Sequence, residues 1–224
     1  MSDAVSPIPL EDLDGLRGAV LRLILLPDNN AELLSGKAED SERSRAVDCT
    51  RALAWSLAQD PYTFPSSYDD GENLQNHQGV TPKIFVNSTR WNGFVEWAVF
   101  VGTAWRTSRT VVPSPTFALR SVLGEVFQGS TELAERDFFW RLPTILPVLD
   151  GGTYRTTVEG QIGQPWRKLL DHEVSLSLSA ALLTLEHEGT LRLEARSDAP
   201  ARRLLGAGGV ESRSVSHVVR LGAA

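Results

Sequence analysis

The chain has 224 residues, a net charge of −6 and a composition typical of globular proteins, with 42% hydrophobic and 22% charged residues. Its length allows one large domain or two small ones. No run reaches the roughly 20 apolar residues of a membrane-spanning helix. The first residues, MSDAVSPIPLEDLDG, lack the basic and apolar regions of a signal peptide. We therefore expect a cytoplasmic protein without a membrane partner.

Chemical motifs are scarce. The single cysteine, Cys49, excludes an internal disulfide and a cysteine-rich zinc site, and its helical surroundings favour a buried thiol. The four histidines lack metal-ligand spacing, and no nucleophile-elbow, zinc-protease or phosphate-loop motif occurs. We expect no catalytic residue, no metal and no cofactor. The alternative is a hydrolase with dispersed residues, which needs a pocket that brings His172 or His187 to a carboxylate.

The acidic excess lies in the first two-thirds of the chain. Residues 1–149 hold 13 Lys and Arg against 19 Asp and Glu, whereas residues 150–224 hold 9 of each. Non-specific affinity for nucleic acids comes from neutralised phosphates, so an acidic chain is not a generic nucleic-acid binder. A local basic face in the C-terminal third is compatible with this distribution.

In chain order, apolar residues at helical spacing first predict helices at residues 10–26 and 43–59. Residues 61–89 are rich in Pro, Gly, Asn and Asp, and they predict a long loop with one short helix at 70–78. Loops of this length are uncommon in compact domains unless they pack or bind something.

The stretch RWNGFVEWAVFVGTAW, residues 90–105, predicts a buried helix. A basic turn, a short strand at 110–112 and a helix at 116–127 come next. A buried helix followed by a small hairpin is typical of a winged helix-turn-helix. The tryptophans of the first helix are expected to pack the core, rather than form a ligand cage, at Trp91, Trp97 and Trp105.

The C-terminal part predicts the same order of elements. Helices are expected from Thr131, at 153–162 and at 176–188. The alternating segment TLRLEAR and the segment RRLL, residues 190–205 with their turn, then predict a hairpin, followed by a final strand or helix. The sequence therefore predicts a mainly α protein with small β-hairpins (α+β). We expect tandem winged helix-turn-helix-like domains at residues 1–129 and 130–224.

The helix at 176–188 occupies the position of a recognition helix, but it has no residue suited to reading bases. No Lys or Arg occurs from Val174 to Leu191, whereas direct readout uses Arg, Lys, Asn or Gln. An exposed Leu183 would favour the docking of a protein instead. The positions expected to be exposed are Ser177, Ser179, Leu183, Thr184 and His187.

The predicted C-terminal hairpin is rich in arginine. Its side chains could form a ridge that contacts the phosphates of duplex DNA without reading sequence. The alternative is an ordinary surface hairpin whose arginines pair with Glu186, Glu188, Glu194 and Glu211. The candidate nucleic-acid-binding residues are Arg192, Arg196, Arg202, Arg203 and Arg213.

Several stretches together resemble DpdG-type proteins. They are RALAWSLAQDP (51–61), NSTRWNGFVEWAVFVG (87–102), VVPSPTFALRSVL (111–123), LPVLDGG (146–152), RSDAPARRLLGAGG (196–209) and RSVSHV (213–218). DpdG-type proteins are accessory proteins encoded with bacterial systems that insert 7-deazapurines into DNA and restrict unmodified DNA. The resemblance covers most of the chain from about residue 45 onward. It implies a setting in defence against phage and foreign DNA, and it implies no reaction.

We therefore expect a non-catalytic subunit of a bacterial anti-phage assembly for DNA modification and restriction. It would dock other subunits through its apolar and acidic N-terminal surface, and contact the DNA backbone through the C-terminal hairpin. The alternative is a dimeric winged-helix transcriptional regulator, which needs an exposed basic recognition helix.

Overall fold

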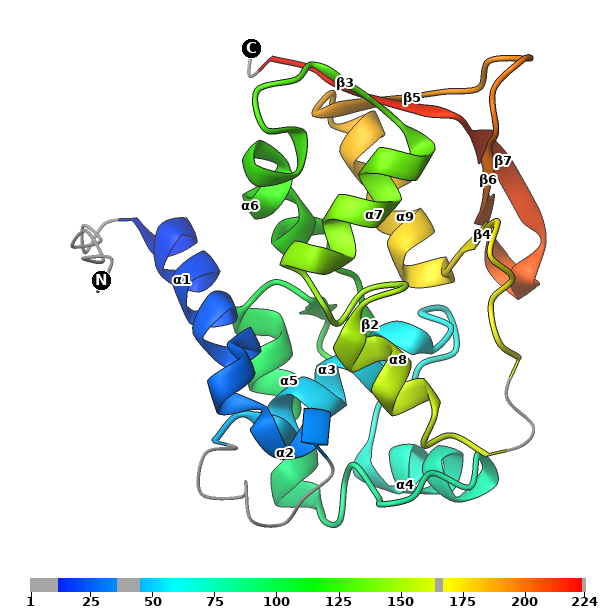
Figure 1. Cartoon of the computed structure of the whole chain (residues 1–224). Helices are drawn as coiled ribbons and strands as arrows, with labels where there is room; N and C mark the ends of the chain where they lie inside the picture. Colours follow the sequence, from blue (N-terminus) through cyan, green and yellow to red (C-terminus); the bar gives the residue numbers. More distant parts are fainter. Residues whose placement is uncertain (1–11, 36–44, 164–166, 223–224) are drawn as a thin grey trace.

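The structure is a computed structural model that describes residues 12–35, 45–163 and 167–222 (Figure 1). The helices are α1 (Leu13–Leu25), α2 (Ala31–Ser35), α3 (Val47–Ala58), α4 (Tyr68–His77), α5 (Ser88–Phe100), α6 (Thr116–Phe127), α7 (Glu135–Ile145), α8 (Thr153–Glu159) and α9 (Leu176–His187). The strands are β1 (Ala104–Arg106), β2 (Val111–Pro113), β3 (Glu132–Ala134), β4 (Glu173–Val174), β5 (Leu191–Glu194), β6 (Arg202–Leu205), β7 (Glu211–Val215) and β8 (His217–Arg220). The mainly helical α+β class is confirmed.

Polar side chains fix where several helices begin. The carboxylate of Asp12 accepts from the Gly15 N–H at 2.7 Å, and the amide oxygen of Asn87 accepts from the Arg90 N–H at 2.9 Å. Each satisfies a backbone donor that the first helical turn leaves free. The helices predicted at 10–26, 43–59, 70–78, 116–127 and 176–188 are confirmed within the described residues, with ends that differ by up to a few residues. Residues 10–11 and 43–44 of the first two ranges lie outside the described residues.

The helix predicted through residue 105 ends early, because Gly102 terminates it. Gly102 has a φ of 75°, its N–H donates to Val99 O, and the Thr103 N–H donates to Ala98 O at 2.9 Å. These paired bonds cap the last carbonyls with a left-handed glycine. Trp105 therefore lies on β1 and is 51% exposed, and Trp97 is 48% exposed. The expectation that Trp97 and Trp105 pack the core is therefore wrong. It holds for Trp91, which is 3% exposed.

The loop at 61–89 closes the aromatic core around α4. Phe64 and Phe85 pack on Trp55 with ring centroids 5.8 and 5.7 Å apart, and Phe85 also contacts Trp91 at 5.0 Å. The Gln75 side chain accepts from the Ile84 and Phe85 N–H groups at 2.7 and 2.9 Å. The length of this loop is therefore explained by packing.

The C-terminal strands do not form the predicted hairpin. β5 pairs with β8 in the sheet β3-β8-β5, while β6 pairs with β4 and β7 in a second sheet. Ser216, between β7 and β8, joins the two: its N–H donates to Glu194 O at 2.8 Å, and its Oγ accepts from the Arg196 N–H. β8 therefore occupies the edge of β5 at which β6 was expected to pair. β6 pairs instead with β7, the strand that follows it in the sequence.

The chain from residue 131 also begins differently from the prediction. Residues 132–134 form β3, which pairs antiparallel with β8, and α7 starts only at Glu135. The pairing partner is more than 80 residues away in the sequence, so local helical spacing could not reveal it. The helix expected from Thr131 is therefore wrong over its first turn.

α9 is a buried helix rather than an exposed one. Ser177 and Ser179 are fully buried, and their hydroxyls donate to Leu57 O at 2.6 Å and Val174 O at 3.1 Å. Leu183 is half-buried against the core. The expected exposure of these three side chains is wrong, while Thr184 and His187 are exposed.

The buried apolar side chains on the two sides of residue 129 form one contiguous cluster. α8 packs against α3, and the two helices lie side by side in Figure 1. The Tyr154 hydroxyl of α8 donates to Leu25 O at 2.9 Å. The boundary at residue 129 and the tandem winged-helix arrangement stay predictions.

Candidate functional site

Four of the five candidate arginines lie on strands of two sheets, Arg196 lies in the loop after β5, and each one is paired with a carboxylate. The Arg196 guanidinium donates to both oxygens of Glu132 at 2.9 and 2.7 Å, and to Glu194 at 2.7 Å. Arg192 donates to the other oxygen of Glu194 at 2.9 Å. These bonds hold the pKa of both carboxyl groups below the usual range and raise that of Arg196.

The remaining candidates are paired in the same way. Arg202 lies 3.0 Å from Glu135 and stacks over the Phe139 ring, Arg203 lies 3.7 Å from Glu211, and Arg213 donates to Glu186. Three of the four glutamates expected in the alternative interpretation are therefore partners, whereas Glu188 pairs with Arg120. Contact with DNA through these arginines stays a prediction, and it would compete with these ion pairs.

The histidines lie apart from the pockets described below. The His172 Nε2 is buried and has no hydrogen-bond partner among the described residues, and the His217 Nδ1 lies 3.0 Å from the Ser216 hydroxyl. No group of three His, Cys, Asp or Glu residues in the described part of the chain could hold a metal ion. Neither His172 nor His187 lines those pockets.

Cys49 is half-buried, and its thiol is expected to react slowly in the folded protein. Burial raises the pKa of its thiol to about 12, because the charged thiolate loses its hydration. At about pH 8 only about one thiol in ten thousand would be ionised, and the thiolate is the reactive form. We expect iodoacetamide to leave the folded protein unmodified and to alkylate Cys49 once urea unfolds it. Intact-protein mass measures both, and equal rates in the two states would contradict the burial.

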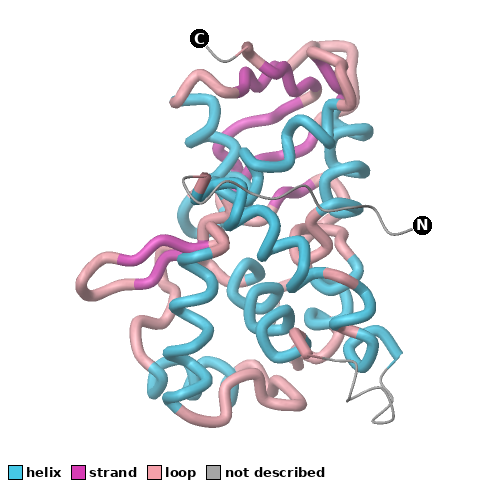
Figure 2. The backbone as a smooth tube through the Cα atoms, turned by 90° about the vertical axis from the view of Figure 1, so that its left-hand side faces the viewer, coloured by secondary structure: helices cyan, strands magenta, loops and turns pink. Residues whose placement is uncertain are grey.

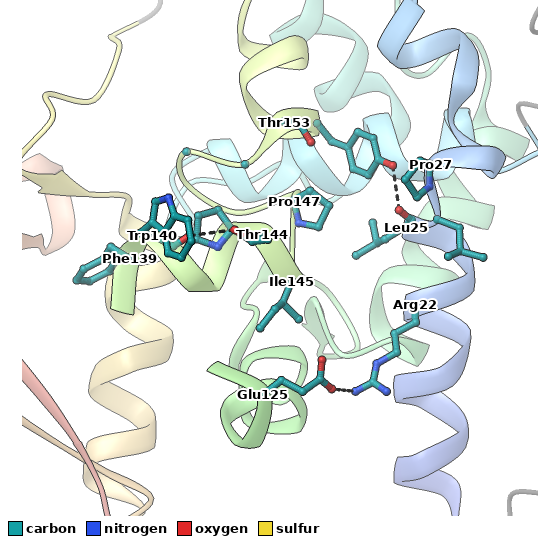
Figure 3. Close-up of a pocket in the computed structure, with 15 residues that line it drawn as sticks. Arg22, Leu25, Pro27, Glu125, Phe139, Trp140, Thr144, Ile145, Pro147 and Thr153 are labelled. Carbon is teal, nitrogen blue, oxygen red and sulfur yellow. Dashed lines mark hydrogen bonds and ion pairs between the residues drawn. The ribbon is translucent and has the colours of Figure 1, made fainter. Parts of the chain in front are cut away.

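A groove of about 880 Å³ lies between the C-terminal end of α1 and the helices α7 and α8 (Figure 3). We call it the α1–α7 groove. Arg22 and Glu125 are its charged lining residues, and they pair with each other across one end, as Figure 3 shows. The other lining residues are neutral: Leu25, Leu26, Pro27, Phe139, Trp140, Pro143, Thr144, Ile145, Pro147, Gly151, Gly152, Thr153 and Tyr154.

Trp140 stands at the rim of this groove. It is 70% exposed, while Phe138 and Phe139 before it are 0% and 7% exposed. Helical spacing could have revealed it, since Phe138 and Leu142 lie on the inward face of α7 and residue 140 then points away. An exposed tryptophan beside a groove is the typical centre of a protein contact.

Apolar surface continues from the groove along α1. Leu21 and Leu25 face the core, whereas the leucines of the other face are between 43% and 56% exposed. A contiguous exposed apolar patch on a globular protein marks an interaction surface. The exposed leucines are Leu13, Leu16, Leu23 and Leu26.

No helix in the described ranges is long and apolar enough to cross a membrane. No curated protein and no solved structure matches the chain. The chain does match the DpdG-like family over residues 2–199, a span that includes the α1–α7 groove, Arg192 and Arg196, and ends before β6. This family suggests a role in the Dpd defence system. The chain therefore belongs to the DpdG-like family.

Proposed function

We propose that this chain is a non-catalytic subunit of the Dpd defence system that docks another protein of that system in the α1–α7 groove. The observation that carries the proposal is the exposed Trp140 at the rim of a large, mainly apolar groove. Tryptophan is enriched among residues that dominate binding energy. The leucines on the outer face of α1 extend the same surface.

The charges of the groove indicate what it would accept. Arg22 and Glu125 neutralise each other, so the lining has no net charge. A charged segment would lose its hydration there without a partner, which costs free energy. The occupant is therefore an uncharged apolar segment of a partner protein, long enough to reach from α7 to the outer face of α1.

The other candidate functions have less support. α9, the helix in the recognition position, carries no Lys or Arg, which disfavours a regulator that reads bases. Backbone contact by the C-terminal arginines would require their ion pairs to open. Several of these pairs are exposed, and exposed pairs contribute about 0–1 kcal/mol, so opening them would cost little free energy. No contact among the residues that the structure describes favours DNA over the carboxylates, however, and DNA contact by these arginines stays a prediction.

Replacement of Trp140 by alanine is expected to weaken binding to the partner protein about 30-fold or more, since buried anchor residues contribute about 2 kcal/mol or more. The free energy of unfolding should change little, because Trp140 is exposed in the free protein. Calorimetric titration against each purified Dpd protein measures the dissociation constant. The matched control is Trp97→Ala, an exposed tryptophan outside the groove. Equal effects of the two changes, or wild-type binding by Trp140→Ala, would overturn the proposal.

A further inference from the structure

We infer that the β1–β2 hairpin and the pocket at its base bind single-stranded nucleic acid. The hairpin projects from the body of the molecule, at the left of Figure 2. Its residues from Trp105 to Thr110 are all exposed. This surface lies apart from the α1–α7 groove, and the two share no lining residue, so the inference does not rest on the docking proposal.

A tight, hydrogen-bonded turn holds the tip of the hairpin. The Thr107 N–H donates to Thr110 O at 2.9 Å, and the Thr107 hydroxyl accepts from the Arg109 and Thr110 N–H groups at 3.2 and 3.0 Å. Ser108 and Arg109 are thereby presented at the end of a rigid element. Preorganised donors of this kind bind a ligand without first losing conformational entropy.

The hairpin lies in the longest acid-free part of an acidic chain. No Asp or Glu occurs between Glu96 and Glu125, whereas this stretch contains three arginines. Arg109 makes no ion pair with any described residue. Arg106 pairs with Glu96, whose side chain is 67% exposed, and such pairs contribute little in water. A phosphate can therefore replace that carboxylate as the partner of Arg106.

The pocket at the base of the hairpin has a volume of about 470 Å³ and combines aromatic with basic groups. Trp105 offers a half-exposed indole face at its edge. Arg17 lies over the Phe117 ring at 5.2 Å, and its buried Nε lacks an acceptor among the described residues. Arg120 also lines the pocket, where it pairs with Glu188, and Arg17 lies 3.5 Å from Asp14. The exposed fractions of the Arg120 and Glu188 side chains are 41% and 40%, and exposed pairs of this kind contribute little in water, so a phosphate can compete for the guanidinium. The pocket thus offers a stacking surface and guanidinium donors, one of them without an acceptor.

This combination favours an unpaired nucleotide over the other anionic partners. Bases of a single strand stack on exposed aromatic side chains while basic residues follow the phosphates. In a duplex the base faces are already stacked on each other. A duplex could therefore contact the arginines but could not stack a base on Trp105. An acidic peptide would likewise leave the indole unused.

The test uses fluorescence anisotropy of labelled oligonucleotides of about 15 nucleotides, dT and rU in parallel, at about 50 mM salt. We expect the wild type to bind at least one of the two. Trp105→Ala should raise the dissociation constant about fivefold or more, the equivalent of one lost stacking contact. Trp105→Phe should largely restore binding, since it keeps an aromatic face. Arg106→Ala with Arg109→Ala should weaken binding and flatten its salt dependence.

Three controls make the outcome decisive. Trp140→Ala should bind oligonucleotide normally, and Trp105→Ala should bind the protein partner normally, so the two proposals fail separately. A matched duplex and a poly-glutamate peptide should bind more weakly than the single strand. Absence of oligonucleotide binding, duplex or peptide binding as tight as that of the single strand, or insensitivity to Trp105→Ala would overturn the inference.

Discussion

Replacement of Trp55 by alanine is expected to lower the free energy of unfolding by about 3–5 kcal/mol. Trp55 is 0% exposed and contacts both Phe64 and Phe85, so the change leaves a cavity in the aromatic core. Its indole N–H donates to the Gln78 side chain at 3.0 Å, and that acceptor would be left buried without a donor. Urea denaturation followed by circular dichroism measures the loss.

The substitution Trp55→Phe separates packing from hydrogen bonding. It keeps an aromatic ring in the cluster but leaves the amide oxygen of Gln78 buried without a hydrogen-bond donor. We expect this to lower the free energy of unfolding by about 1–3 kcal/mol. The Gln78 amide donates to Gln59 at 2.7 Å, and the Gln59 amide donates back to Trp55 O at 3.0 Å, so the bond belongs to a closed network. A loss below about 1 kcal/mol for Trp55→Ala would contradict the central place of this residue in the core.

Replacement of Arg155 by methionine is expected to cost a further large amount, about 3–5 kcal/mol. The Arg155 side chain is 1% exposed and pairs with Glu159 and Asp150, whose own side chains are 23% and 10% exposed. Removal of the guanidinium leaves partly buried carboxylates without a cation. Asp150 also accepts from the Ser175 N–H at 2.7 Å, so the loss reaches the start of α9.

A double-mutant cycle checks this interpretation. Arg155→Met combined with Glu159→Gln removes one of the uncompensated charges together with the cation. The double variant should therefore be more stable than the sum of the single losses indicates. Urea denaturation of the wild type, the two single variants and the double variant gives the coupling free energy between Arg155 and Glu159. Additive losses would mean that Arg155 acts through packing of its aliphatic part and not through its charge.

Most helices could be predicted because their information is local. Apolar spacing and flanking Pro, Gly and Asn gave the helix at 116–127 to the residue, and α1, α3 and α4 within a few residues. The missed helix end had a local signal too, because Gly102 stands where a left-handed cap belongs. A helix that ends at this cap does not include Trp105. Trp105 then lies on the β1–β2 hairpin, where its side chain is exposed.

The strand pairing could not be predicted because it is non-local. RRLL fits a return strand by composition, yet β8 competes for the edge of β5 and takes it. The candidate arginines show the same limit. Arg196 pairs with Glu132, which is 64 residues away in the sequence, so the chain alone could not say whether that guanidinium was free.

We propose above that a protein of the Dpd system occupies the α1–α7 groove. Hydrogen–deuterium exchange of the chain, alone and with its purified partner, tests it most directly. The claim predicts protection confined to the outer face of α1 and to α7 with the 147–152 turn, and unchanged exchange in the β1–β2 hairpin. Protection of the hairpin or of the β6–β7 strands, with α1 and α7 unchanged, would contradict it.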